Sequence, residues 1–110
     1  MGLIVKKYIP DYWVIVEITS SNDKVRKVFA SWYGGFINGD SWRLSSGITE
    51  ILDINDEYYE IHNESGSVYI CNKNRYGMSL YAESVYADLI RKKSEDIEFF
   101  ILDEEKIYDS

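Results

Sequence analysis

The sequence offers little of the chemistry that cysteine and histidine supply. Its 110 residues include one cysteine, Cys71, and one histidine, His62. A lone cysteine cannot form an internal disulfide, and one Cys with one His falls short of the usual ligand set of a zinc site. We therefore expect no bound metal and no cofactor.

Basic residues and long apolar runs are also scarce. Lys and Arg number 12 against 19 Asp and Glu, which gives a formal net charge of −7, whereas nucleic-acid binding needs basic residues to displace counterions from phosphates. No apolar run approaches the roughly 18 residues that span a bilayer, and the first residues lack the pattern of a secretion signal. We expect a cytoplasmic protein that binds neither nucleic acid nor membranes.

What the sequence does contain is the apolar content of a folded protein. Hydrophobic residues make up 45% of the chain and aromatic residues 15%, with ten Tyr. The length suits one hydrophobic core and is short for two. Residues 1–110 are therefore expected to form a single domain.

Strand-like patterns dominate the chain. The expected strands are Tyr12–Thr19, Lys24–Tyr33, Ile48–Ile54, Tyr58–Asn63 and Ser67–Asn72. A helix is expected at Met78–Lys93, followed by a strand at Ile97–Leu102 and an acidic, frayed tail from about Asp103. This order predicts an α+β fold, with a five-stranded antiparallel meander, then one helix and a final strand.

Two details of this pattern concern pairing. Residues 25–32 have apolar positions at helical spacing, but their β-branched and aromatic side chains favour a strand. Ser65 and Gly66 are expected at the centre of a two-residue turn, a register that pairs His62 with Tyr69 and Glu60 with Cys71.

The expected sheet is too wide for the single helix. Five or six strands span roughly 24 Å at their usual spacing, and one helix is about 10 Å across. Trp13 and Val14 nevertheless place apolar side chains on both faces of their strand. We therefore expect a homodimer that buries the second face. An aromatic ligand groove and a strongly curved sheet that covers itself are the alternatives.

The glycine-rich stretch from Trp32 to Gly47 is the best candidate for binding. Its glycines let a ligand approach the backbone, while Trp42 offers a flat face and Arg43 a forked donor for a carboxylate. With other aromatic residues nearby, the candidate binding residues are Trp13, Tyr33, Phe36, Asp40, Trp42 and Arg43. The alternative is a structural loop in which Asp40 pairs with Arg43 and a Trp plugs the core.

Catalysis has weaker support. Glu60 and His62 could exchange a proton, and Cys71 with His62 could act as nucleophile and base. In the expected register, however, the Cys and His lie diagonally, roughly 7–8 Å apart between backbones. We assign no catalytic residue.

Two stretches, SWYGGFINGDSWRLSSGITEI and YEIHNESGSVYICNKNRYGMSLY, resemble small uncharacterised bacterial proteins of the kind carried on integron gene cassettes and other mobile elements. The resemblance spans roughly residues 9–89 and implies a bacterial accessory protein, with no activity, cofactor or catalytic residue.

Together these features predict a non-enzymatic, homodimeric binding or interaction protein, with another protein or a small organic ligand as partner. A small-ligand-binding module with an aromatic groove is the first alternative. A small enzyme that uses Glu60, His62 or Cys71 is the second.

Overall fold

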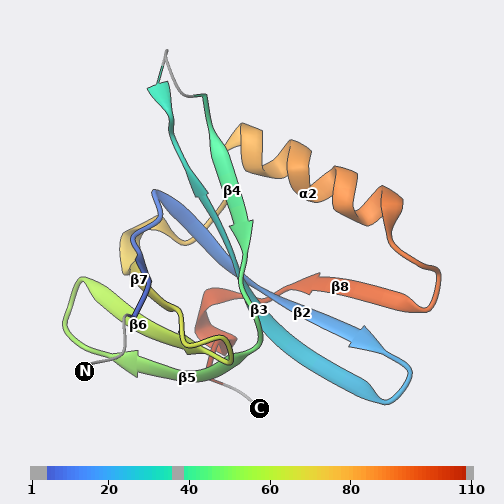
Figure 1. Cartoon of the computed structure of the whole chain (residues 1–110), viewed down its shortest axis with the longest axis horizontal. Coiled ribbons are helices and arrows are strands. Elements are labelled where there is room, and N and C mark those ends of the chain that lie inside the picture. Colours follow the sequence, from blue (N-terminus) through green and yellow to red (C-terminus); the bar gives the residue numbers. More distant parts are fainter. Residues whose placement is uncertain (1–4, 36–38, 109–110) are drawn as a thin grey trace.

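A computed structural model describes residues 5–35 and 39–108 of the chain. Its strands are β1 (Lys7–Tyr8), β2 (Tyr12–Ser20), β3 (Asp23–Trp32), β4 (Ser41–Leu44), β5 (Ile48–Asp53), β6 (Tyr58–Asn63), β7 (Val68–Asn72) and β8 (Ile97–Ile101). Its helices are α2 (Leu80–Lys92) and two 3₁₀ turns, η1 (Lys73–Arg75) and η2 (Glu104–Lys106). The fold is α+β, as predicted (Figure 1).

The strands form two four-stranded sheets rather than one meander. One has the order β1-β7-β6-β5 and is called here the β6 sheet; the other has the order β4-β3-β2-β8 and is called the β3 sheet. The antiparallel neighbours β2 and β3, and likewise β5, β6 and β7, pair as predicted. The prediction of a single five-stranded sheet is wrong, because β3 and β5 belong to different sheets.

The change of sheet takes place in the glycine-rich stretch. Its second half forms β4, which pairs with β3, and residues 45–47 then carry the chain across to the β6 sheet. Gly47 is buried there, and a Cβ atom on it would lie 2.9 Å from Glu64 Oε1 and 3.1 Å from Val25 Cγ2. The Glu64 and Val25 side chains therefore pack closely around this glycine.

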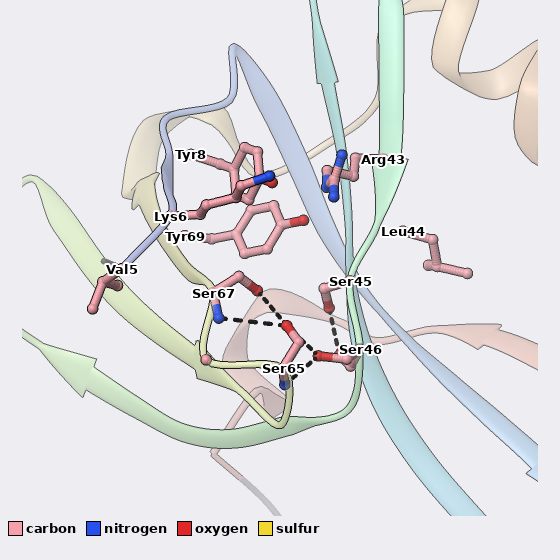
Figure 2. A pocket seen from close by; sticks show the side chains of 11 residues that line it. Val5, Lys6, Tyr8, Arg43, Leu44, Ser45, Ser46, Ser65, Ser67 and Tyr69 are labelled. Carbon is pink, nitrogen blue, oxygen red and sulfur yellow. Dashed lines mark hydrogen bonds between the residues drawn. The ribbon is translucent and has the colours of Figure 1, made fainter. Parts of the chain in front are cut away.

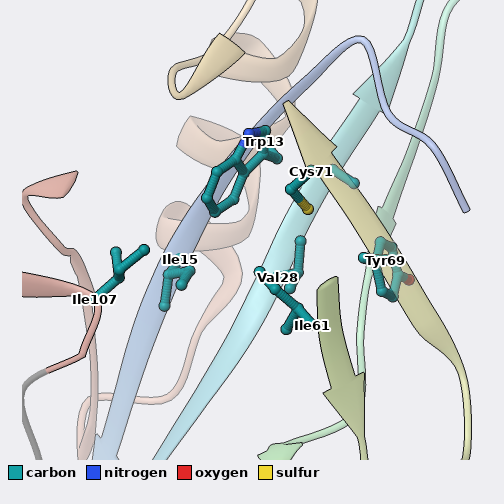
Figure 3. Packing of buried hydrophobic residues seen from close by; sticks show 8 residues of the cluster. Trp13, Ile15, Val28, Ile61, Tyr69, Cys71 and Ile107 are labelled. Carbon is teal, nitrogen blue, oxygen red and sulfur yellow. The ribbon is translucent and has the colours of Figure 1, made fainter. Parts of the chain in front are cut away.

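The β3 sheet is the middle layer of the molecule. One of its faces packs against the β6 sheet in a core cluster that consists of Trp13, Ile15, Val28, Ala30, Ile61, Tyr69, Cys71 and Ile107 (Figure 3). Its other face, which carries Val14, Val16 and Phe29, packs against Ala82 of α2. Alternate residues of β2 thus point to opposite layers, as the period of a strand requires.

The homodimer was predicted because one helix is too narrow to cover a wide sheet, and this layering removes that reason. Both faces of the middle sheet are covered within one chain, close to the alternative in which the strands cover themselves. Residues 25–32 are strand, as preferred, with β3 paired to β2 from Asp23 to Ser31. The homodimer itself stays a prediction.

The helix matches its predicted range closely. Ser79 caps its first turn by accepting a hydrogen bond from the Ala82 N–H (3.1 Å). Near the C-terminal end, Arg91 and Lys92 both pair with Asp88. No helix in the described part of the chain is long and apolar enough to cross a membrane.

The β6–β7 hairpin is one residue out of the predicted register. The Asn63 N–H donates to Ser67 O (3.1 Å) and the Gly66 N–H donates to Asn63 O (2.9 Å), so the loop contains residues 64–66. Gly66 has a φ of 90°, which explains the glycine. His62 pairs with Val68 and Tyr59 with Cys71, and a one-residue shift moves side chains to the other face.

The end of the chain is packed rather than frayed over its described residues. Ile107 is 2% exposed and belongs to the core cluster, and the Tyr108 ring lies edge-on to Tyr59 with centroids 5.8 Å apart. The sequence predicted a frayed tail from about Asp103, whereas Ile107 and Tyr108 both contact the rest of the fold.

Candidate functional site

A pocket of about 620 Å³ opens where edge strands of the two sheets approach each other. The strands are β1, at the edge of the β6 sheet, and β4, at the edge of the β3 sheet. We call it the seam pocket; its lining residues are Val5, Lys6, Tyr8, Arg43, Leu44, Ser45, Ser46, Ser65, Gly66, Ser67 and Tyr69 (Figure 2).

An arginine and two tyrosines form one wall of the seam pocket. Parallel pairing of β1 with β7 sets Tyr8 beside Tyr69, and their rings stack with centroids 4.9 Å apart. Arg43 Cζ lies 4.6 Å from the centroid of the Tyr8 ring, within the range of a cation–π contact. The guanidinium is thus held in place by an aromatic ring instead of a carboxylate.

Strand pairing explains why Arg43 points into the pocket. Arg43 lies opposite Ala30, whose side chain belongs to the core cluster between the sheets, so both side chains are on the inner face. Figure 2 shows Arg43 directed toward Tyr8 and Tyr69. Burial raises the pKa of Tyr69, an effect that the nearby Arg43 charge partly offsets. The Tyr69 phenol is therefore neutral at neutral pH and keeps its proton for donation.

Four serines form the opposite wall. Ser45 Oγ accepts from the Val28 N–H (2.8 Å) and donates to Ser46 O (2.7 Å). Ser46 Oγ donates to Ser65 Oγ (3.0 Å), which lies 3.1 Å from Ser67 Oγ. Whichever of Ser65 and Ser67 donates in the bond between them, the O–H of the other is left to a ligand.

The charges of the seam pocket are positive, in contrast to the chain as a whole. None of its lining residues is Asp or Glu. Within residues 5–35 and 39–108, neither Lys6 nor Arg43 forms an ion pair. The Glu64 carboxylate, next in sequence to Ser65, lies against Gly47. The wall thus presents two cations and several hydroxyl donors, which suits an anionic group.

A second hollow, of about 640 Å³, is lined by Tyr59, Asp103, Glu104 and Glu105. Its acidic groups suggest a cation. Among the described residues, however, no group of three or more His, Cys, Asp and Glu side chains is placed to hold a metal ion. The seam pocket, which joins cations, hydroxyls and aromatic rings, is the better candidate.

Of the predicted binding residues on β4, only Arg43 lines the seam pocket. Trp42 is on the opposite face, where its ring lies 5.8 Å from that of Phe29 and is 40% exposed. Asp40 does not pair with Arg43 but accepts a hydrogen bond from the Gly34 N–H (3.2 Å). The structure therefore places Trp42 and Arg43 on opposite faces of β4 rather than around one pocket.

The other predicted binding residues are dispersed. Trp13 is fully buried in the core cluster, and its indole N–H donates to Asn72 O (2.7 Å). Tyr33 is 55% exposed and lies edge-on to Tyr12, outside the seam pocket. Phe36 lies outside the described residues.

The structure separates the candidate nucleophile from the candidate base. Cys71 is buried in the core cluster, and burial raises the pKa of its thiol far above the ordinary value. His62 is on the other face of the hairpin, where its Nε2 lies 3.1 Å from Glu60 Oε1. The Cys/His pair considered from the sequence is therefore not assembled, and neither Glu60 nor His62 lines the seam pocket.

Sequence reasoning missed most of the pocket. Lys6, Tyr8 and Tyr69 come together only through the parallel pairing of β1 with β7, a contact between distant segments with no local signal. Ser65 was predicted in a turn and Ser45 and Ser46 lie in the glycine-rich stretch, whereas Ser67 was assigned to a strand. The proximity of these serines was not predicted, because it depends on the crossing between the sheets.

Comparisons with models of protein families, with curated proteins and with solved structures gave no match to this chain. The resemblance to integron-cassette proteins therefore stays a prediction.

Proposed function

We propose that this protein is a non-enzymatic binding protein that takes an anionic ligand in the seam pocket. The observation that carries the proposal is Arg43, held over Tyr8 and beside Tyr69 in a pocket without an acidic lining residue. Arginine recognises carboxylate, phosphate and sulfate groups through a planar fork of donors. A ligand with such a group is the class that this wall fits best.

The hydroxyl groups support the same ligand class. The neutral Tyr69 phenol and one O–H from the Ser65–Ser67 pair remain as donors after the internal hydrogen bonds are counted. Lys6 adds a second positive charge at the rim. A volume of about 620 Å³ is within the range for small-molecule sites, so the anion can belong to an organic molecule with an apolar part for the tyrosines.

Binding is favoured over catalysis because the reactive groups lie elsewhere. No His, Cys, Asp or Glu lines the seam pocket, which leaves no ordinary general base at neutral pH. The enzyme that would use Glu60, His62 or Cys71 has a nucleophile buried on one face of a hairpin and a base on the other.

Calorimetric titration with sulfate, inorganic phosphate and citrate tests the proposal. We expect at least one anion to bind the wild-type chain, and Arg43→Ala to weaken that binding about tenfold or more, the scale of a lost charged hydrogen bond. Arg75→Ala is the matched control, because Arg75 also lies over a tyrosine, Tyr12, but outside the seam pocket. Equal losses in the two variants would reject the pocket, as would no binding at all.

A second proposal keeps the homodimer, now at an edge strand. On β8, Phe100 is 51% and Ile101 39% exposed, and β8 is the last strand of the β3 sheet. Exposed apolar edges promote pairing with another chain. Light scattering over a dilution series should show a dimer of the 12.9 kDa chain that Phe100→Ser weakens; a monomer at every concentration would reject it.

A further inference from the structure

We propose that the natural ligand of the seam pocket is an extended acidic peptide, which adds as a strand to β4 and places a carboxylate beside Arg43. The inference rests on the proposed anion binding and names the partner. Two independent features carry it: the free main-chain groups of β4, and the charge of the pocket next to them.

Among the described residues, no strand pairs with the outer edge of β4. The Ser45 N–H donates to Val28 O (2.9 Å), which fixes the alternation along the β3–β4 ladder. Ala30 with Arg43, and Trp32 with Ser41, then exchange main-chain hydrogen bonds. The main-chain groups of Trp42 and Leu44 point the other way, toward the side on which residues 5–35 and 39–108 supply no further strand.

The open edge and the seam pocket adjoin. Leu44 lines the pocket, yet Figure 2 shows its side chain directed away from the other lining residues. Its main chain therefore forms part of the wall. A peptide that hydrogen-bonds to β4 at this point runs along the mouth of the pocket, as in other cases of strand addition to a sheet edge.

The two faces of β4 specify an alternating partner sequence. Arg43 is on the inner face with Ala30, whereas Trp42 and Leu44 are on the face that packs toward α2. Side chains of an added strand alternate in the same way. The partner should therefore offer apolar side chains to the half-exposed Trp42 and acidic side chains to Arg43.

Charge complementarity selects the acidic partner. Lys6 and Arg43 are the charged lining residues of the pocket, and no lining residue offsets them. A basic peptide would meet both cations at close range, whereas a carboxylate can accept from Arg43, from Tyr69 and from a serine hydroxyl. Like charges placed together at an interface reject the wrong partner.

A capped heptapeptide of alternating Val and Glu is the probe, since acetyl and amide caps leave only side-chain carboxylates. We expect it to bind wild type. Its affinity should fall about tenfold or more in Arg43→Ala and stay unchanged in Arg75→Ala. The matching Val/Lys peptide should not bind. Two further analogues carry N-methyl groups, one on every Val and the other on every Glu. Only one of these two sets of N–H groups faces β4 in an added strand. The affinity of one analogue should therefore fall about tenfold and that of the other should change little.

Amide hydrogen exchange gives a readout that a simple anion site would not change. The amides of Trp42 and Leu44 should exchange rapidly in the free protein and slow at least tenfold with the Val/Glu peptide. The Arg43 amide, already bonded to Ala30, serves as the internal control and should be slow in both states. Slow exchange of Trp42 and Leu44 before any peptide is added would show the edge already covered, and would overturn the inference.

The outcomes separate this inference from the proposed function. Sulfate binding without peptide binding, equal binding of both methylated analogues, or equal binding of the Val/Lys peptide would overturn the added strand and leave the anion site intact. Failure of every anion and of the Val/Glu peptide would overturn both.

Discussion

Two arginine–tyrosine contacts in this chain have the same chemistry but different surroundings. Arg43 Cζ lies 4.6 Å from the ring centroid of Tyr8, and Arg75 Cζ lies 5.3 Å from that of Tyr12. Arg43 lines a pocket next to the buried Tyr69. Arg75 is on the surface, where its Nη1 donates to the Tyr12 hydroxyl (3.3 Å).

The neighbouring tyrosines show what the surroundings do. Burial raises the pKa of Tyr69 despite the nearby Arg43. At the surface, hydrogen bonds from Tyr33 and Arg75 lower the pKa of Tyr12, and the charge of Asp11 partly opposes them. A cation over an aromatic ring is thus not by itself an anion site. Both arginines are exposed, but Arg43 lines a pocket that has no acidic lining residue, whereas the charge of Asp11 acts on Tyr12.

The largest expected effect comes from reversing each charge. Arg43→Glu should reduce sulfate affinity by at least about 100-fold, because it removes a charged hydrogen bond and adds repulsion. Arg75→Glu changes the net charge of the chain equally but should leave the affinity within about twofold, since Arg75 does not line the pocket and salt screens exposed charges. Calorimetry with sulfate at one ionic strength checks both.

Equal weakening of sulfate binding by Arg43→Glu and Arg75→Glu would contradict the distinction drawn between the two arginines. The net charge of −7 would then govern anion binding, and the seam pocket would have no special role.

A smaller effect is expected from the tyrosine hydroxyls. Tyr69→Phe removes a neutral donor from the pocket and should weaken sulfate binding about threefold to tenfold, the range for one hydrogen bond. Tyr12→Phe should leave sulfate affinity unchanged. Denaturant unfolding of both variants provides the control: if Tyr69→Phe lost sulfate binding only together with a large loss of stability, its hydroxyl would be structural.

The elements of the fold could be predicted from local patterns, but not their division into two sheets. β-Branched and aromatic side chains identified β2 and β3, and an apolar stripe at helical spacing identified α2. The change of sheet brings Gly47 close to the Glu64 and Val25 side chains, a contact that no local pattern reveals. The width of the predicted sheet suggested that one of its faces was left uncovered, and the second sheet in fact covers that face.

The candidate site was harder to predict, because it depends on register and on pairing between distant segments. A two-residue turn at Ser65-Gly66 would place Tyr69 opposite His62; the observed three-residue loop places it opposite Ile61, facing the core. Arg43 was identified from its side-chain chemistry alone. Its partner Tyr8 is in a two-residue strand paired to β7, far too short to predict.

The pH dependence should differ between the two regions. No lining residue of the seam pocket is a His, Asp or Glu, and the pKa of Tyr69 is raised, so sulfate affinity should stay constant between about pH 6 and pH 8. The folded state holds the Tyr69 proton more tightly than the unfolded state. The resulting stability is therefore complete below about pH 10 and is lost as pH rises through the raised pKa.

Unfolding of wild type and Tyr69→Phe across alkaline pH measures this loss, which should be smaller in the variant. A fall in sulfate affinity between pH 6 and pH 7 would contradict the prediction, because it would show that a group outside the seam pocket governs binding.

The smallest expected effect is on the pKa of Tyr12, which contacts Arg75 at the surface. Arg75→Ala should raise the pKa of Tyr12 toward its ordinary value of 10.0, and Tyr33→Phe should raise it further, because the Tyr33 hydrogen bond is the larger cause of the lowering. The free energy of unfolding should change by less than about 0.5 kcal/mol in Arg75→Ala, as for most surface substitutions. NMR titration of labelled tyrosine rings measures the pKa. If Arg75→Ala instead destabilised the fold by more than about 1 kcal/mol, the surface contact would be structural, and a different control for Arg43 would be needed.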